Sequence, residues 1–296
     1  MTYGTATAFR QALEERLRRL SLESNTSLSR LRKLVAFDRL LARMVTMNPD
    51  LWVLKGGYAL EIRLGARART TKDVDAALLA PLEDASNLLA AAASAQLKDW
   101  FEFEVGQPDQ AATGAPLGGL RFSVRCLLDG RLFESFHLDV GAGDPLPREV
   151  DYLTGPALLE FAGIAPARVP AYPLAQQLAE KIHALTRPYA GGEVSRVKDL
   201  VDILLIGQMC DFKIEVLRDA LMSIFEGRNT HPVPERLPSP PRSWNRPFSR
   251  LATELDAPWS RLEDAALAAR EFLDPVLSSQ VDSTWDPIEW RWTSVS

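Results

Sequence analysis

Two stretches of alternating side chains, joined by an Asp-Gly pair, constrain the fold of this chain more than any other feature. Apolar and polar residues alternate through residues 120–128 and again through residues 131–140. A period of two is typical of a β-strand buried on one face. The intervening Asp129-Gly130 favours a tight hairpin, because both central positions tolerate positive φ. We therefore predict an antiparallel hairpin, and the chain has to fold around a β-sheet.

Apolar patterns predict further elements on both sides of this hairpin. Short apolar runs predict strands at residues 51–54, 73–79 and 101–105. Helical periodicity predicts helices at residues 9–22, 28–47, 58–64, 85–97, 174–185, 196–206 and 259–273. The segment Asn25-Thr26-Ser27 is a candidate cap for the second of these helices, and Asp84 for the fourth.

The pattern changes after a Pro/Gly-rich connection at residues 145–173, beyond which it is helical. Six prolines between Pro232 and Pro247 predict an irregular linker there. We expect an α/β (α+β) protein, in which residues 1–150 form an α/β lobe with N-terminal helices and residues 151–296 form a mainly helical lobe.

Composition excludes several classes of protein. Two cysteines and three histidines among 296 residues are too few for a disulfide framework or a standard zinc site. No apolar run approaches the ~18 residues that span a bilayer, so we expect a cytoplasmic protein without membrane association. The net charge of −5 argues against a general nucleic-acid coat, although residues 55–72 form a local basic cluster.

Asp73 and Asp75 are the first candidate site residues. Positions i and i+2 of a strand project from the same face, so the two carboxylates converge and can bind Mg²⁺. Gly56-Gly57 lies ahead of them between a predicted strand and a predicted helix, where backbone approaches a phosphate closely. Solvated aspartates at a strand end and a plain tight turn are the alternatives.

Asp139 is the candidate third acid. It shares the polar face of the second hairpin strand with His137. In a mixed sheet it can lie next to Asp73 and Asp75, as a metal ligand or as a base toward a hydroxyl. An isolated aspartate at the sheet edge explains the sequence equally well.

The helix at residues 174–185 places Lys181 at the edge of its apolar stripe and His183 roughly opposite, which predicts a surface position for His183. On the next helix, Arg196, Asp199 and Asp202 recur along one edge. Surface ion pairing explains this spacing. Asp202 lies among apolar residues, however, and an enclosed acid needs a partner, for which Lys181 or Arg196 is suitable.

Together these stretches resemble the AbiEii/AbiGii-type nucleotidyltransferase toxins, including the MenT group of mycobacterial toxin–antitoxin systems. The first family motif, Gly-Gly-X-X-Leu and then Arg-X-Ser-X-Asp-X-Asp, is matched by residues 56–60 and 69–75, with Thr71 in place of the serine. The second motif, Lys-(Leu/Ile)-His-Ala and then Arg-X-X-Asp-Leu-X-Asp, is matched by residues 181–184 and 196–202.

The resemblance implies a polymerase-β-like nucleotidyltransferase fold and metal-dependent transfer of a nucleotide from an NTP, with release of pyrophosphate. It implies Mg²⁺ or Mn²⁺ as the cofactor and the 3′ acceptor end of tRNA as the target. Modification of tRNA at this end is expected to block aminoacylation and arrest growth, and an antitoxin protein is the expected partner. The expected catalytic residues are Asp73, Asp75, Lys181, Asp202 and Asp139. Among them, Lys181 is expected to receive the triphosphate, and Asp202 to anchor Lys181 or a metal-bound water. The expected metal ligands are Asp73, Asp75 and Asp139, and the expected nucleotide or phosphate contacts are Gly56, Gly57, Lys55, Arg69, Thr71 and Arg196.

Two other functions are compatible with the residues alone. A nucleotidyltransferase acting on a protein hydroxyl or on a small molecule such as an aminoglycoside fits the acidic net charge. A binding module without catalytic activity is the other. One regulatory hypothesis concerns Thr71, which shares the strand face of Asp73 if that strand extends so far. A phosphate placed there by the antitoxin adds negative charge beside the metal ligands.

Overall fold

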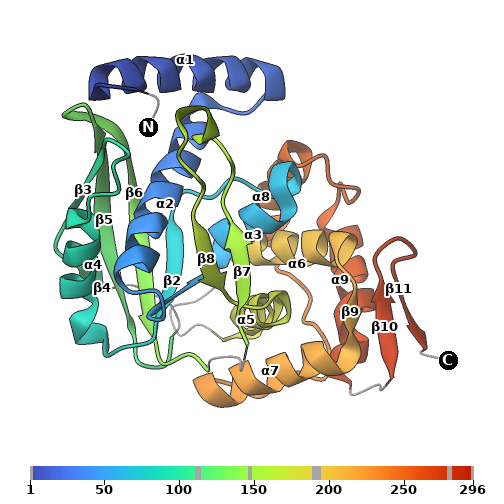
Figure 1. Ribbon diagram of the computed structural model, residues 1–296. Helices are drawn as coiled ribbons and strands as arrows, with labels where there is room; N and C mark the ends of the chain where they lie inside the picture. The colour runs from blue at the N-terminus through green and yellow to red at the C-terminus, as the bar shows by residue number, and fades with distance from the viewer. Residues whose placement is uncertain (1–2, 111–114, 146–148, 189–194, 279–281, 295–296) are drawn as a thin grey trace. The chain divides into compact units, whose positions relative to one another are not determined.

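The computed structural model (Figure 1) describes residues 3–110, 115–145, 149–188, 195–278 and 282–294. The chain forms two compact units. The first comprises residues 1–63, 70–143 and 150–172, and the second comprises residues 64–69, 144–149 and 173–296. Residues 150–172 thus group with the N-terminal strands. Of the helices in the described part of the chain, none combines the length and the apolar character needed to cross a membrane.

The first unit is built around an eight-stranded mixed sheet with the order β3-β5-β6-β2-β1-β8-β7, in which β4 also pairs with β5. The β2–β6 and β1–β8 pairs are parallel and the others are antiparallel. The strands are β1 (Trp52–Lys55), β2 (Val74–Leu78), β3 (Phe101–Val105), β4 (Asp109–Gln110), β5 (Gly119–Leu128), β6 (Arg131–Ala142), β7 (Asp151–Thr154) and β8 (Arg168–Ala171).

The predicted hairpin is confirmed as β5 and β6. Asp129 and Gly130 have φ values of 56° and 63°, which is the left-handed pair that a tight two-residue loop requires. The even positions Phe122, Val124 and Cys126 are buried, whereas Arg121 and the other odd neighbours are exposed. One register shift between Cys126 and Leu127 marks a bulge near the hairpin end.

Among the described residues, the helices that accompany this sheet are α1 (Ala6–Ser24), α2 (Leu28–Met47), α3 (Gly56–Leu64) and α4 (Ala85–Ser94). Helix α2 has the predicted bounds, and the Ser27 hydroxyl caps it by accepting a hydrogen bond from the Arg30 N–H. The prediction for Asp84 is wrong, because Asp84 ends a 3₁₀ turn in helical conformation and makes no side-chain cap bond. Apolar faces of α1, α2 and α4 pack with one face of the sheet into the main core.

Strands β7 and β8 lie in the stretch that the sequence presented only as a connection. Pro156, Gly163 and Pro170 interrupt the apolar pattern there, and each strand has four residues. Such short strands are specified by their sheet neighbours rather than by periodicity. β8 pairs with β1 at Leu54 and Ala171, and it brings Tyr172 beside the end of β1.

The second unit contains α5 (Leu174–Thr186), α6 (Val197–Met209), α7 (Ile214–Arg228), α8 (Asn245–Glu254) and α9 (Leu262–Leu277). It also contains a three-stranded sheet of β9 (Phe212–Lys213), β10 (Ser283–Asp286) and β11 (Arg291–Ser294). The linker predicted around Pro232–Pro247 is only partly irregular, since α8 begins inside it. Pro247 stands in the first turn of α8, where its missing N–H removes no intrahelical hydrogen bond.

Candidate active site

A row of acidic side chains crosses the face of the first unit's sheet that lies opposite the main core. In the parallel β2–β6 pair, Asp75 is the register partner of Asp139 and Val74 is the partner of Leu138. Asp73, one residue before β2, continues this register, and its Oδ1 lies 3.4 Å from Nδ1 of His137. The structure thus brings Asp73, Asp75 and Asp139 onto neighbouring positions of one sheet face.

Arg121 lies beside this acidic row, and the sequence did not identify it as a site residue. It is the register partner of Asp139 in the β5–β6 hairpin. Its Nε and Nη2 donate to the two oxygens of the Asp139 carboxylate, at 2.7 and 2.6 Å. The pKa of Arg121 is raised, mainly by this hydrogen-bonded pair and further by the charges of Asp73 and Asp75. Its position on the polar side of the alternating strand was the available signal.

Gly56 has to be glycine because of Asp75. Its φ is +66°, and a Cβ at this position would lie 2.0 Å from Oδ2 of Asp75. The strand β1 ends at Lys55 and α3 begins at Gly56, as the Gly56-Gly57 pair predicted. The close approach that glycine permits here is to the Asp75 carboxylate, which packs directly on the start of the helix.

Lys55 brings a cation to the same face. It is buried, and it is the register partner of Asp75 across the antiparallel β1–β2 pair. Its Nζ lies 5.5 Å from the ring centroid of Tyr172, a cation–π distance. Lys55 therefore lies beside the acidic row, where the resemblance places a phosphate contact.

Glu61 of α3 holds the segment that leads into the acidic row. Its carboxylate accepts from Nε of Arg30 at 2.7 Å and from the backbone N–H of Thr71 at 3.2 Å. The Thr71 hydroxyl is buried and donates to the carbonyl of Asp73 at 3.1 Å. Because β2 begins only at Val74, Thr71 does not share the strand face of Asp73, and its modification would require this segment to open.

The donor set of the row fits a hard divalent cation. Asp73 and Asp75 offer carboxylate oxygens, which Mg²⁺ and Mn²⁺ prefer, and one or two protein carboxylates commonly hold a cation that also binds phosphates. The close packing of Asp75 on Gly56 fixes one of them. Within the described residues, no three acidic, histidine or cysteine side chains are grouped to hold a metal ion. Asp139, the expected third ligand, forms an ion pair with Arg121.

A second cluster, in the second unit, gathers the charged residues of the later motif. Nζ of Lys181 donates to Oδ2 of Asp202 at 2.6 Å and reaches Oδ1 of Asp199 at 3.5 Å. The predicted partner of the enclosed Asp202 is thus Lys181. Arg69, expected at a phosphate, donates Nε and Nη2 to the same Asp202 carboxylate at 2.9 and 2.8 Å. Arg196, the other predicted partner, reaches Asp199 at 3.5 Å.

The charges of this cluster hold each other ionised. Burial alone raises the pKa of Asp202, but Lys181 and Arg69 together outweigh burial, so the pKa is lowered. Burial lowers the pKa of Lys181, and the carboxylates of Asp202 and Asp199 outweigh it, so the pKa is raised. Lys181 and Asp202 therefore form a charged pair at neutral pH.

The predicted surface position of His183 is wrong. Its side chain is buried, contacts the ring of Phe225 on α7, and shares a hydrogen bond of 2.8 Å with the Thr230 hydroxyl. Burial, reinforced by Arg228 and other nearby cations, lowers the pKa of His183 to about 3. Helix α7 covers this side of α5, and nothing in the periodicity of α5 alone indicates that cover.

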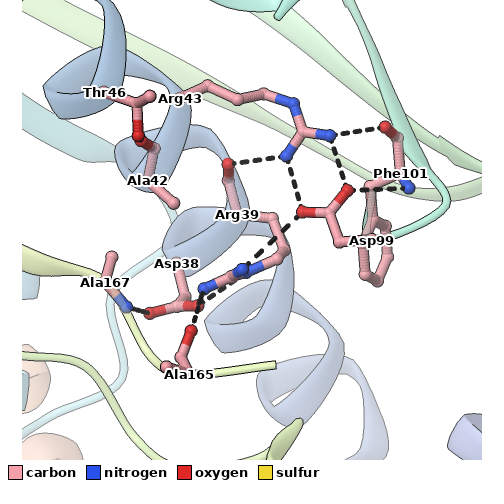
Figure 2. A network of polar contacts seen from close by, with 9 residues as sticks. All are labelled: Asp38, Arg39, Ala42, Arg43, Thr46, Asp99, Phe101, Ala165 and Ala167. Atoms are coloured by element: carbon pink, nitrogen blue, oxygen red, sulfur yellow. Dashed lines mark hydrogen bonds and ion pairs between the residues drawn. The ribbon is translucent and has the colours of Figure 1, made fainter. Parts of the chain in front are cut away.

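A third charged cluster is entirely interior to the first unit (Figure 2). Arg43 of α2 donates to both oxygens of Asp99 at 2.8 and 2.6 Å and to the carbonyl of Phe101 at 2.6 Å. Arg39 pairs with Asp38, whose other oxygen accepts from the N–H of Ala167 at 2.7 Å. These contacts join α2 to the start of β3 and to the segment before β8. The sequence offered no signal for them beyond charges in a mostly apolar helix.

Comparisons with known proteins agree with this architecture. The family model of the AbiEii nucleotidyl transferase toxins of type IV toxin–antitoxin systems matches residues 39–287. The fold resembles that of MenT4, a nucleotidyltransferase toxin from Mycobacterium tuberculosis H37Rv, with a TM-score of 0.61 and 17% identity over 94% of this chain and 92% of that one. JHP933 from Helicobacter pylori matches with a TM-score of 0.44 and 15% identity over 83% and 89% of the two chains. Curated protein sequences give no match.

The chain belongs to the AbiEii nucleotidyltransferase toxin family, since the family model covers most of its length. It is a nucleotidyltransferase toxin of a type IV toxin–antitoxin system, with an α/β fold shared with MenT4. The family implies an NTP substrate and an antitoxin partner. The family motifs quoted from the sequence now have positions in the fold: the acidic row and Gly56 in one unit, and the Lys181–Asp202 cluster in the other.

Proposed function

We propose that this enzyme transfers a nucleotide from an NTP to the 3′-hydroxyl at the acceptor end of tRNA and thereby blocks aminoacylation and growth. The observation that carries the proposal is the acidic row on the sheet, where Asp75 packs on Gly56 at the start of a helix. A carboxylate row beside a helix start is suited to a nucleoside triphosphate bound with a divalent cation. The resemblance to the MenT group supports tRNA as the acceptor.

Asp73 and Asp75 are the residues that we propose to hold Mg²⁺ or Mn²⁺. The bound cation neutralises triphosphate charge and makes the α-phosphorus more electrophilic. In the protein, Lys55 and Arg121 supply further positive charge beside the row. In phosphoryl-type transfer most of the catalysis comes from such positioning and charge neutralisation, so no covalent nucleophile on the protein is needed.

In the proposed reaction the oxygen of the acceptor 3′-hydroxyl forms a bond to the α-phosphorus. The bond from that phosphorus to the bridging oxygen of the β-phosphate breaks, and pyrophosphate leaves with the electron pair. The hydroxyl proton passes to a carboxylate of the row, for which we propose Asp139. This role requires Arg121 to release at least one oxygen of Asp139, and the triphosphate offers the guanidinium an alternative anion.

The test is a transfer assay with purified protein, Mg²⁺, each α-labelled NTP in turn, and total tRNA. We expect labelled tRNA with wild-type protein and a strong loss of labelling with Asp73→Asn. The matched control is Asp50→Asn, which removes an exposed carboxylate outside the site and leaves labelling unchanged. Equal labelling by Asp73→Asn and wild type would contradict the assignment of the acidic row.

Two further arms of the assay separate the acceptor from the chemistry. Labelling that survives RNase treatment, or appears on an aminoglycoside or a protein, would replace tRNA by the other acceptor class.

Lys181 stays a predicted triphosphate contact, which Lys181→Gln tests through the KM for NTP. The pairing of Lys181 with Asp202 supports a positioning role for Asp202, and Asp202→Asn is expected to reproduce the effect of Lys181→Gln.

A further inference from the structure

Helix α8 presents a row of arginines on its exposed face. Arg242, in the 3₁₀ turn that leads into the helix, is followed by Arg246 and Arg250 at intervals of four residues. All three side chains are exposed, whereas Trp244 and Phe248 on the other side are buried. At about 1.5 Å of rise per residue, Arg246 and Arg250 stand about 6 Å apart along α8, and Arg242 precedes them in the 3₁₀ turn. We call these three arginines the α8 ladder.

The local excess of positive charge around this ladder is unusual for a chain that is acidic overall. The chain has a net charge of −5, yet residues 236–253 contain four arginines and no aspartate or glutamate. Like charges four residues apart, such as Arg246 and Arg250, destabilise a helix. Within the described residues, the ion pair recorded for the ladder is Arg250 with Glu254, at 2.9 Å between two exposed side chains. The arrangement is unfavourable for the helix itself, and an anionic partner relieves it.

A hollow of about 380 Å³ adjoins the ladder. Arg242 and Asn245 form one side of it, and α9 forms the other. Its lining also includes Ser239, Leu262, the acidic Glu263 and Arg270. Arg270 is anchored there, because it donates to the carbonyl of Leu237 at 3.1 Å and to the Ser239 hydroxyl at 2.8 Å. The volume lies in the range of small-ligand sites.

We propose that the α8 ladder binds the phosphate backbone of the RNA acceptor and that the adjoining hollow receives an unstacked base. Arginine is the residue best suited to phosphate, because its planar guanidinium makes paired hydrogen bonds and is weakly hydrated. The spacing of the ladder is comparable with the step between phosphates along a strand. The biological meaning of this surface rests on the proposed polynucleotide acceptor, but binding is measurable without transfer.

The experiment measures the affinity of fluorescently labelled tRNA by anisotropy, without NTP, for full-length Asp73→Asn protein and for the same protein with Arg242→Gln, Arg246→Gln and Arg250→Gln. We expect the triple substitution to weaken binding about tenfold or more. We also expect the slope of log affinity against log salt to become shallower by about 2 to 3, the equivalent of three phosphate contacts. The matched control removes three exposed cations elsewhere, with Arg19→Gln, Lys213→Gln and Arg291→Gln.

An unchanged affinity and salt slope in the ladder variant would overturn the proposal, and so would an equal loss in the control variant. Competition by polyglutamate as effective as competition by RNA would also overturn it, since the face would then be a general anion or acidic-protein site. Circular dichroism and the Tm establish that the variants fold. If the ladder substitutions weaken tRNA binding but the wild-type protein transfers no nucleotide, the binding surface is supported and the proposed function is rejected. If the wild-type protein transfers nucleotides to tRNA but the ladder substitutions leave binding unchanged, the proposed function is supported and the binding surface is rejected.

Discussion

The first unit contains two charged clusters that differ in how their charges are balanced. In the interior cluster, Asp38 and Asp99 are matched by Arg39 and Arg43, and all four side chains are at most 5% exposed. On the sheet face, the three carboxylates of the acidic row face Arg121 and Lys55. Here Asp73 and Arg121 are 39% and 44% exposed, whereas Asp139 is 13% exposed and Lys55 is buried.

The difference follows from the environment of the two clusters. A buried charge without a partner costs several kcal/mol, so an interior network has to balance its charges within the protein. A row that is partly exposed to solvent can keep more carboxylates than cations. Charge balance and burial together therefore separate a cluster that holds the fold from the row that we propose to bind a divalent cation.

The largest expected effect on stability comes from breaking the interior cluster. Asp99→Ala leaves the buried guanidinium of Arg43 without its main partner, and we expect it to lower the free energy of unfolding by about 3–5 kcal/mol. Urea denaturation measures this. The control is Glu104→Ala, which breaks an exposed ion pair with Arg125 and should change stability by less than about 1 kcal/mol. A loss below about 1 kcal/mol for Asp99→Ala would remove the contrast between the two clusters.

A substitution in the acidic row should impair activity and leave stability nearly unchanged. We expect Asp73→Asn to lower the rate of nucleotide transfer by about 10²–10³-fold or more, because the charge stabilisation of the reaction is lost. Its free energy of unfolding should stay unchanged or rise slightly, since a carboxylate is removed from a row of like charges. Transfer kinetics and urea denaturation on the same preparation test both parts. A large loss of stability would place Asp73 with the interior cluster.

Gly56 sharpens the comparison because it links the acidic row to the backbone. We expect Gly56→Ala to reduce stability by about 1–3 kcal/mol and to impair transfer, since the new Cβ collides with the Asp75 carboxylate. Gly65 also has a positive φ, of 59°, but has open space around it. Gly65→Ala is thus a control for backbone strain alone. Equal effects of the two substitutions would show that the contact with Asp75 is unimportant.

The smallest expected effect extends the comparison to a buried titratable group in the second unit. The pKa of His183 is about 3 in the folded protein, mainly because of burial, and near 6.5 when unfolded. Between pH 7 and 5 the unfolded chain therefore binds a proton that the folded protein does not, and stability falls as pH falls. The contribution is at most about 1.4 kcal/mol per pH unit.

His183→Gln should make stability less dependent on pH in this range, as measured by urea denaturation at pH 7, 6 and 5. The control is His137→Gln, which removes an exposed histidine. The same pH dependence in wild type and His183→Gln would show that His183 is not kept neutral by the fold.

Elements with strong local signals were predictable from the sequence. The β5–β6 hairpin and helix α2 were found because alternation, an Asp-Gly turn and a serine cap act over a few neighbouring residues. The pair Asp73 and Asp75 was found for the same reason. Arg121, Asp99 and the burial of His183 were missed, because their partners are distant in sequence: Arg121 is 18 residues from Asp139, and Arg43 is 56 residues from Asp99.

The sequence by itself determined the periodicity of the main strands and helices, the family motifs and the residue types of the acidic row, because these depend on local backbone preference and on chemistry carried by single side chains. Only the tertiary structure decided that Arg121 holds Asp139, that Arg69 and Lys181 share Asp202, and that Asp75 packs on Gly56. These pairings depend on strand register and helix packing, which bring distant residues together, and no local pattern encodes them.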